Sequence, residues 1–407
     1  MNILILTQFY PPESGAPQNR LSDLARRLSD MGHTVTVLTA MPNYPTGKVF
    51  PEWRGKLFSC ESAEGVRILR TWIYPATGRR FLPRIFNYFS FVFSSIIMGF
   101  WRTGPLDYVI TESPPLFLGI SGWLFSRLRR ARLIMNISDL WPESAVALGV
   151  VTNPILIGAS TQLEMFLYRS SRFITGQTAG IVSNISNRIP GKPVILMTNG
   201  VDIQRFPPRK SIKSSELEAE FKLEGIFVAG YAGLLGLAQG LETVIEAGRL
   251  LRDHPGVVIA LFGSGPEKDR LSELSKDLPN IRIFPPQPSR RVPEILSLFD
   301  VALIPLKKND LFRGALPSKM FEAMASELPL VLSVEGEAED LIRHADAGIC
   351  VRPEDPRAMA DAIILLLNDQ KARVRMGTNG RTHVFKHYNR EHIARNFANL
   401  LEEHYDR

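Results

Sequence analysis

The sequence predicts an α/β protein of two domains, each built on a parallel β-sheet that helices cover on both faces. The chain has 407 residues, which is long for a single hydrophobic core. Short apolar runs alternate with segments of helical periodicity, the pattern typical of doubly wound sheets. A polar stretch, 207–220, separates two such series. We therefore expect two Rossmann-like domains that bind ligands beyond the carboxyl ends of their strands.

The first series of elements ends at residue 199. The run 2–7 is apolar, and the next apolar residues, from Leu21 to Leu28, follow at helical spacing until Gly32. The same alternation then continues. The strands expected in this series are 2–7, 33–39, 67–72, 108–111, 133–137, 172–175 and 194–197.

The second series follows the polar stretch and occupies 200–387. Helices are expected at 241–251 and 357–367, and the tail 388–405 has the apolar stripe of an amphipathic helix. The strands expected in this series are 227–231, 257–262, 281–284, 301–304 and 330–332.

Basic charge is concentrated in the first half of the chain. Residues 1–199 contain 20 Lys and Arg against 11 Asp and Glu, a net charge of +9, whereas the remainder carries −2. This asymmetry argues against nucleic acid bound across the whole molecule and fits a first domain that meets an anionic surface. Ordinary solubilising charge is the alternative. The arginines that flank its most apolar segments are Arg79, Arg80, Arg84, Arg102, Arg127, Arg129, Arg130 and Arg132.

The segment 85–101 is apolar apart from Asn87, Tyr88 and three serines. As a helix it would be roughly 25 Å long, against a hydrocarbon core of about 30 Å. A buried crossover helix, a helix that dips into a membrane and a membrane span are all open. The flanking arginines and the aromatic residues favour the dipping helix over the span.

The two cysteines and the N-terminal residues indicate the cellular compartment. Cys60 and Cys350 lie in opposite halves, and the first residues lack the charge pattern of a signal peptide. We therefore expect a reducing, cytoplasmic location without disulfides. The sequence contains neither an Asp-x-Asp motif nor a His/Cys cluster that would indicate a metal site.

The most informative motif is Leu-Pro-Ser-Lys-Met-Phe-Glu at 316–322, a loop that runs into a helix. Lys319 and Glu322 would share one face of a helix that begins near Pro317. A cation beside the free N–H groups of a helix N-terminus suits a diphosphate, and a carboxylate one turn later can accept hydrogen bonds from a ribose diol. An exposed Lys–Glu ion pair is the alternative.

Two loops of the first domain also carry polar groups at the ends of strands. The loop 8–20 contains Gly15, which allows close backbone approach, but it lacks the three glycines of a dinucleotide fingerprint. Ser-Asp-Leu-Trp-Pro-Glu at 138–143 places Asp139 and Glu143 after a strand, where catalytic groups collect in such folds. Asp139 as a helix cap, with Pro142 in the first turn, is the alternative, and both roles can hold.

Glycine-rich turns follow two strands of the second domain. The first reads Tyr-Ala-Gly-Leu-Leu-Gly-Leu-Ala-Gln-Gly-Leu at 231–241, and the second is Gly-Ser-Gly-Pro at 263–266. The glycines of the first turn bring backbone N–H groups near an anion, whereas the second turn is expected to be structural. Asn-Gly-Val-Asp at 199–202 lies at the domain boundary.

In this order the blocks resemble those of family 4 glycosyltransferases. The 139–144 and 236–241 blocks are similar to the bacterial surface-polysaccharide subgroup that includes N-acetyl-L-fucosamine transferases. The resemblance implies the GT-B fold, with two Rossmann-like domains facing a central cleft. It makes 1–199 the acceptor domain, completed by the helix 388–407, and 200–387 the donor domain.

The resemblance also implies site residues. Gly15 and Arg20 belong to the acceptor-side loop, with Asp139, and after it Glu143, as candidates that orient or deprotonate the acceptor hydroxyl. The donor-binding residues implied are Asn199, Gly233, Gly236, Gln239, Gly240, Phe284, Ser318, Lys319 and Glu322.

Four positions depart from the family pattern. Ser138 stands where many members have a histidine, and Gly314 where a second glutamate is common. Leu234 and Gln239 replace an arginine and a lysine that hold the donor diphosphate, which makes Lys319 the natural substitute. The identity of the donor sugar is therefore open, and Asp310, Arg313 or Ser318 are candidates for sugar contacts.

The function expected from the resemblance is retaining transfer of a sugar from a nucleotide diphosphate to a lipid-diphosphate-linked saccharide in surface-polysaccharide synthesis. The donor is expected to be UDP-linked, with an N-acetylated amino sugar as one option. Neither a metal nor nucleic acid is expected, and the enzyme would be peripheral on the inner face of the cytoplasmic membrane. A nucleotide-sugar epimerase and a non-catalytic membrane scaffold are the alternatives.

Overall fold

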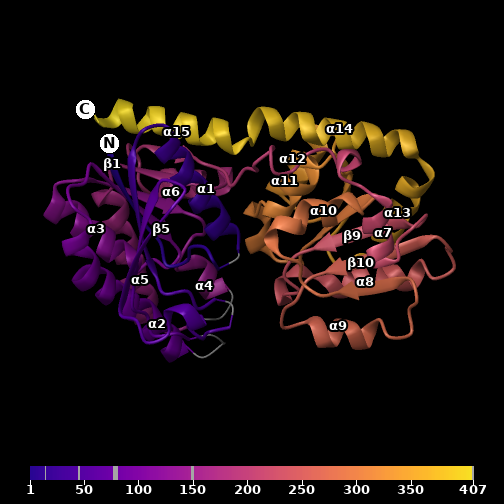
Figure 1. Cartoon of the computed structure of the whole chain (residues 1–407), viewed down its shortest axis with the longest axis horizontal. Coiled ribbons are helices and arrows are strands. Elements are labelled where there is room, and N and C mark those ends of the chain that lie inside the picture. The colour runs from indigo at the N-terminus through magenta and orange to yellow at the C-terminus, as the bar shows by residue number, and fades with distance from the viewer. Residues whose placement is uncertain (14, 45, 77–80, 148–150, 406–407) are drawn as a thin grey trace. The chain divides into compact units, whose positions relative to one another are not determined.

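The computed structural model describes residues 1–13, 15–44, 46–76, 81–147 and 151–405 (Figure 1). Arg79 and Arg80 lie outside the described residues. Two compact units form, the N-terminal unit of residues 1–199 with 391–407 and the C-terminal unit of residues 200–390. Each holds a largely parallel sheet with helices packed on it, so the predicted α/β class with two Rossmann-like sheets is confirmed.

The N-terminal unit has an eight-stranded sheet in the order β3-β4-β2-β1-β5-β6-β7-β8. The central strand β1 is fully buried from Ile3 to Leu6, as a continuous apolar run requires when both faces are covered. Only β3 is antiparallel to its neighbour. The strands are β1 (Asn2–Leu6), β2 (Thr34–Ala40), β3 (Phe58–Ala63), β4 (Val66–Thr71), β5 (Tyr108–Ser113), β6 (Arg132–Ile137), β7 (Phe173–Gly176) and β8 (Val194–Leu196).

Helices cover both faces of this sheet. One core lies beneath α2, α3, α5 and α6, and the other beneath α1 and the last helix, α15. The hydroxyl of Tyr108 in β5 donates to the carbonyl of Leu401 at 2.6 Å, which fixes α15 to this unit. The helices are α1 (Ala16–Asp30), α2 (Phe81–Ser94), α3 (Leu118–Arg129), α4 (Glu143–Ala147), α5 (Pro154–Ser170), α6 (Ala179–Arg188) and α15 (Arg390–Tyr405).

The C-terminal unit has a six-stranded parallel sheet in the order β11-β10-β9-β12-β13-β14. Its strands are β9 (Phe227–Ala232), β10 (Val257–Phe262), β11 (Ile281–Phe284), β12 (Val301–Pro305), β13 (Leu330–Ser333) and β14 (Gly348–Cys350). Its helices are α7 (Ser215–Phe221), α8 (Leu241–Leu250), α9 (Lys268–Leu274), α10 (Val292–Ser297), α11 (Ser318–Ala325), α12 (Glu337–Ala345), α13 (Pro356–Asn368) and α14 (Gln370–His387).

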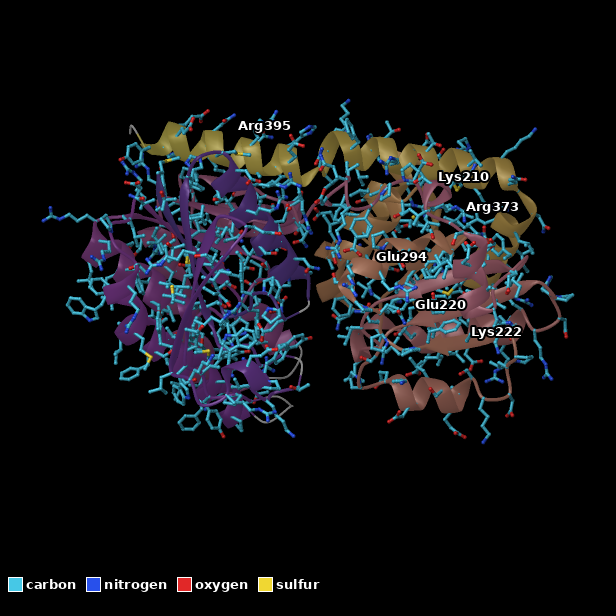
Figure 2. The ribbon with its side chains drawn as sticks, viewed as in Figure 1. Lys210, Glu220, Lys222, Glu294, Arg373 and Arg395 are labelled. Carbon is cyan, nitrogen blue, oxygen red and sulfur yellow. The ribbon has the colours of Figure 1, made fainter. Side chains whose placement is uncertain are left out.

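The expected polar linker 207–220 is wrong in its second half, because α7 occupies it. The Ser214 hydroxyl caps this helix by accepting from the Leu217 amide at 3.2 Å, and Leu217 and Phe221 are buried. Arg291 then joins α7 to α10 through Glu220 at 2.7 Å and Glu294 at 2.8 Å. Figure 2 labels the two carboxylates. Two buried apolar residues anchor this helix although most of its surface is polar.

The apolar segment 85–101 forms most of α2 and two further helical turns, a π-helical η2 (Ser95–Gly99) and a 3₁₀-helical η3 (Phe100–Arg102). Its side chains divide between the core, where Phe91 is fully buried, and solvent, where Trp101 is exposed. Among the described residues, no helix combines the length and the hydrophobicity that crossing a bilayer requires.

Candidate functional site

Lys319 lies at the start of α11 and points at the glycine-rich turn that follows β9. Pro317 precedes the helix, so its fixed φ sets the direction of the first turn. The Lys319 Nζ donates to the hydroxyl of Tyr231 at 2.6 Å and to Oε1 of Gln239 at 2.7 Å. The same Nζ lies 4.1 Å from the centre of the Tyr231 ring. The predicted residues Lys319 and Gln239 are therefore neighbours.

Tyr231 is a site residue that the sequence reading missed. It lies within the apolar strand β9, where an aromatic side chain is typical of core packing. Its hydroxyl accepts from Lys319 and donates to the carbonyl of Leu234 at 2.7 Å, which ties the lysine to the turn. Only the contact across the fold distinguishes it from an ordinary core tyrosine.

Burial lowers the pKa of Lys319 to about 7, and the negative charge of Glu322 opposes this shift. Burial also raises the pKa of Glu322, while the positive charges of Arg390, Arg205 and Lys319 lower it. The two predicted donor-binding groups thus sit in a partly desolvated environment, where an added charge interacts strongly with its surroundings. Ser318 is the first residue of this helix.

The glycines of the turn after β9 are required by close packing. Gly233 has φ 151°, and a Cβ there would lie 3.1 Å from Lys319 Nζ. Gly240 has φ 61°, and its Cβ would lie 3.1 Å from the backbone carbon of Leu306. A side chain at either position would strain the backbone and displace a neighbour.

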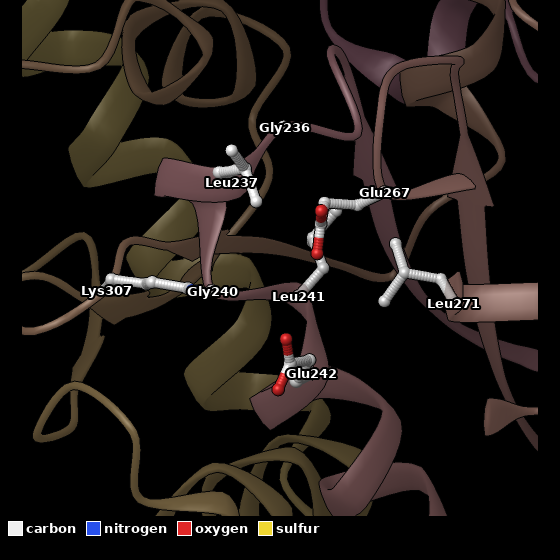
Figure 3. Close-up of a pocket in the computed structure, with 8 residues that line it drawn as sticks. All are labelled: Gly236, Leu237, Gly240, Leu241, Glu242, Glu267, Leu271 and Lys307. Atoms are coloured by element: carbon white, nitrogen blue, oxygen red, sulfur yellow. The ribbon is translucent and has the colours of Figure 1, made fainter. Parts of the chain in front are cut away.

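A shallow surface hollow adjoins this turn (Figure 3). Lys319 and Glu322 do not line it, and two carboxylates, Glu242 and Glu267, face it together with Lys307. Acidic lining disfavours a phosphate in this hollow. The hollow is lined by Gly236, Leu237, Gly240, Leu241, Glu242, Glu267, Leu271 and Lys307.

Phe284 ends β11 with its ring in the core. The ring stacks on Phe262 with centroids 4.5 Å apart, and its carbonyl accepts from the Gly263 amide at 3.2 Å. The donor-binding role of Phe284 stays a prediction.

A buried polar network lies at the carboxyl ends of β5, β6 and β7 in the N-terminal unit. Arg20 in α1 donates to Glu112 at 2.6 Å, to Ser138 at 3.1 Å and to Asn199 at 3.1 Å. Asn136 donates to the other oxygen of Glu112 at 2.6 Å. Arg20 and Glu112 are both almost wholly buried, and breaking such a pair typically costs about 3–5 kcal/mol. The network therefore fixes α1 against the strand ends.

Two residues named from the sequence, Asn199 and Ser138, belong to this network. Asn199 was assigned to the donor side, but the structure places it against Arg20 in the N-terminal unit, so its donor role stays a prediction. Ser138 donates its proton to Glu112 and accepts from Gln177 and Arg20. A hydroxyl held in this way orients its neighbours and cannot take the place of the family histidine as a base.

Asp139 follows Ser138 directly and remains exposed. Desolvation by neighbouring protein atoms raises its pKa, although the residue still reaches solvent, and hydrogen bonds from Ser144 and from the Leu140 amide oppose the increase. An aspartate with a raised pKa is a better proton acceptor than an ordinary one. The Ser144 contact joins two side chains, so the capping role, which requires a backbone N–H of the helix, stays a prediction.

The remaining first-domain residues that the sequence predicts have other partners. Glu143 begins α4 and pairs with Arg188 at 3.2 Å, and Arg188 also binds the buried Glu164. Gly15 caps α1 in an extended conformation, and a Cβ there would lie 2.4 Å from Oε1 of Gln18. Among the described residues, no group of three or more His, Cys, Asp or Glu side chains is arranged to hold a metal ion.

Comparisons with known proteins found two matching family models and one relative that is similar along the whole chain. A model of glycosyl transferase 4-like domains matches residues 15–200, and one of glycosyl transferases group 1 matches residues 214–383. The putative colanic acid biosynthesis glycosyl transferase WcaI of Escherichia coli K12 is 28% identical over 415 residues, which cover 98% of this chain and 99% of WcaI.

Solved structures share the fold at lower identity. Anabaena HepE in complex with UDP and glucose has a TM-score of 0.72 at 17% identity, with 99% of each chain covered. Sucrose-phosphate synthase from Thermosynechococcus elongatus has a TM-score of 0.73 at 18% identity, with 98% of each chain covered. The two domain matches and this fold support a GT-B glycosyltransferase that joins a glycosyl transferase 4-like domain to a group 1 domain.

Proposed function

We propose that this glycosyltransferase moves a sugar, with retention at the anomeric carbon, from a UDP-linked donor to a lipid-diphosphate-linked saccharide. The product would belong to a bacterial surface polysaccharide, and the enzyme would work at the inner face of the cytoplasmic membrane. The observation that carries the proposal is the position of Lys319 against Tyr231 and Gln239, beside the glycine turn of a group 1 domain.

The donor side is assigned from charge and position. Lys319 supplies the cation for the diphosphate, since Leu234 and Gln239 have replaced the two cations usual in the family. Glu322, one turn later on the same helix, would accept hydrogen bonds from the ribose diol. UDP as the nucleotide is supported by the structural likeness to HepE in complex with UDP and glucose. Whether the sugar is a hexose or an acetamidohexose stays open.

The acceptor side is assigned to the N-terminal unit. Asp139 would orient or deprotonate the acceptor hydroxyl, and the Arg20–Glu112–Ser138 network would hold the strand end from which it projects. A surface-polysaccharide product is supported by the similarity along the whole chain to WcaI, a putative colanic acid biosynthesis glycosyl transferase. The net charge of +9 on residues 1–199 favours an anionic, lipid-linked acceptor.

The proposal is tested by measuring UDP release from a panel of UDP-sugars, chosen by thermal shift, with and without a lipid-diphosphate-linked saccharide. We expect release that depends on the acceptor and yields an extended glycolipid with the anomeric configuration of the donor. An epimerase would convert the nucleotide sugar without an acceptor, and a scaffold would do neither. Either result would overturn the proposal.

Glu322→Gln should weaken UDP binding and barely change the binding of inorganic diphosphate, because only UDP has the ribose diol. Calorimetry with both ligands checks this difference. Glu327→Gln is the matched control: this carboxylate follows the same helix but faces Arg381 at 4.0 Å. Equal weakening of both ligands by Glu322→Gln would mean that the carboxylate supports the fold and does not contact the ribose.

A further inference from the structure

The outer face of the helical stretch from α2 through η3 is apolar along its whole length. Five large apolar side chains recur there at helical spacing, and we call them the aromatic ridge. Phe86 and Phe93 are each 66% exposed and Trp101 is 80% exposed. The members of the ridge are Phe86, Phe89, Phe93, Ile97 and Trp101.

Three polar residues of the same stretch face inward. Asn87, Ser94 and Ser95 are buried, and each has a partner in the core: Asn87 accepts from Gln8 at 2.7 Å, Ser94 donates to Thr71 at 3.0 Å, and Ser95 donates to Ser121 at 3.0 Å. A surface helix of a water-soluble protein normally has the opposite arrangement. These three polar groups serve the fold, and the exposed side chains between residues 83 and 101 are all apolar.

Neighbouring helices extend the apolar surface. α3 packs against α2, and α5 packs against α3, on the same side of the sheet. Leu128 in α3 and Ile155 and Phe166 in α5 are also exposed. Extensive exposed apolar surface of this kind marks protein or membrane interaction sites.

The charges near the ridge favour anionic lipid over a second copy of the chain as the partner. The chain has no Asp or Glu between Glu64 and Asp107, and none between Glu112 and Asp139, so both segments carry only positive charge. The guanidinium of Arg102 lies over Phe58 at 4.2 Å, and that of Arg129 over Phe100 at 4.2 Å. Two ridges in a symmetric dimer would bring these arginines together and repel, whereas anionic lipid headgroups would neutralise them.

We propose that the aromatic ridge inserts into the boundary between headgroups and acyl chains of an anionic bilayer, with α2 parallel to the membrane plane. The inference deepens the proposed function, because it names the surface that brings the enzyme to a lipid-linked acceptor. Amphipathic helices at this boundary bury their apolar face by about 5–10 Å, and arginines at their edges reach the headgroups. Insertion adds a hydrophobic contribution to binding that salt does not screen.

The test uses the full chain and vesicles of phosphatidylcholine with a minor share of phosphatidylglycerol. The variant Phe86→Ser, Phe93→Ser, Trp101→Ser should lower the vesicle partition coefficient on the order of a hundredfold. The wild-type protein should keep part of its vesicle binding at about 1 M salt, where the Debye length is about 3 Å. The variant should lose this salt-resistant part. Leu250→Ser, Leu365→Ser, Val374→Ser, three exposed apolar residues of the C-terminal unit, is the matched control and should bind as wild type does.

Depth is measured by quenching tryptophan fluorescence with brominated lipids. Quenching should occur in the wild type and fall sharply in Trp101→Phe, which keeps the ridge apolar. The ridge variants bear only surface changes, so UDP affinity and melting temperature should stay unchanged.

Three outcomes separate the ideas. Vesicle binding that is unchanged by the ridge variant and lost entirely in salt would overturn the ridge proposal and leave the transferase proposal standing. A ridge-dependent dimer without vesicle binding, seen by sedimentation, would also overturn it. Ridge-dependent insertion by a protein that neither binds nor uses UDP-sugars would support the ridge and refute the proposed function.

Discussion

Asp139→Asn should lower turnover by about a hundredfold to ten-thousandfold, the range typical for loss of a general base. Donor affinity and melting temperature should stay nearly unchanged. The amide keeps the size of the side chain and part of its capping ability but cannot accept the acceptor's proton. Because the pKa of Asp139 is raised by desolvation, wild-type turnover should decline with falling pH at values above the ordinary aspartate range.

Two further variants decide whether Asp139 acts as a base or as a helix cap. Ser144→Ala removes a hydrogen bond to the carboxylate but leaves its charge, so it should spare most of the turnover. Glu143→Gln removes a neighbouring carboxylate that pairs with Arg188, and we expect a smaller loss than for Asp139→Asn. If Asp139→Asn and Ser144→Ala both lower the melting temperature and turnover is near normal, Asp139 is only a cap.

Lys319→Ala should weaken UDP binding by about tenfold to a hundredfold, because one charge-assisted contact is typically worth about 1.5–3 kcal/mol. The two cations that hold the diphosphate in most family members are absent here, so no neighbouring charge at those positions would compensate. Calorimetry checks this loss. Tyr231→Phe keeps the charge and the ring but removes the hydroxyl that positions Nζ, so its loss should be smaller. Unchanged UDP affinity in Lys319→Ala would remove Lys319 from the site.

The same lysine should make UDP affinity depend on pH. Burial lowers the pKa of free Lys319 to about 7, and a bound diphosphate favours the ammonium form and raises that pKa again. Below the lower pKa the lysine is charged in both states and contributes no pH dependence. As pH rises above it, binding must take up a proton, so affinity should fall. Lys319→Arg, whose guanidinium stays charged, should remove this dependence.

Long apolar strands made the fold class predictable, whereas short or polar edge elements were missed. Two edge strands, β3 and the three-residue β14, were not predicted. β3 is Phe-Ser-Cys-Glu-Ser-Ala and is partly exposed, so its pairing with β4 supplies an order that its composition does not indicate. In α7 only Leu217 and Phe221 face the core, and its polar remainder was interpreted as linker.

The candidate site was predictable where residues adjoin in sequence or share a motif. Lys319, Glu322 and the glycine turn could be named from their motifs. Tyr231 and Glu112 could not, because each belongs to a buried strand and gains its meaning from a partner far along the chain. Tyr231 meets Lys319 across 88 positions, and Glu112 meets Arg20 across 92. Single-sequence periodicity carries no information on such pairs.

The last helix, α15, gives the protein an unusual order of assembly during translation. The core between β1, β5 and α1 includes Phe397 and Leu401, so the N-terminal unit lacks part of its wall until the final residues are made. The hydroxyl of Tyr108 binds the carbonyl of Leu401, which is synthesised 293 positions later. At about 5–20 residues per second the delay after residue 199 is roughly 10–40 s. During that time an apolar face of the nascent domain stays open to water, and surface of this kind is prone to aggregate.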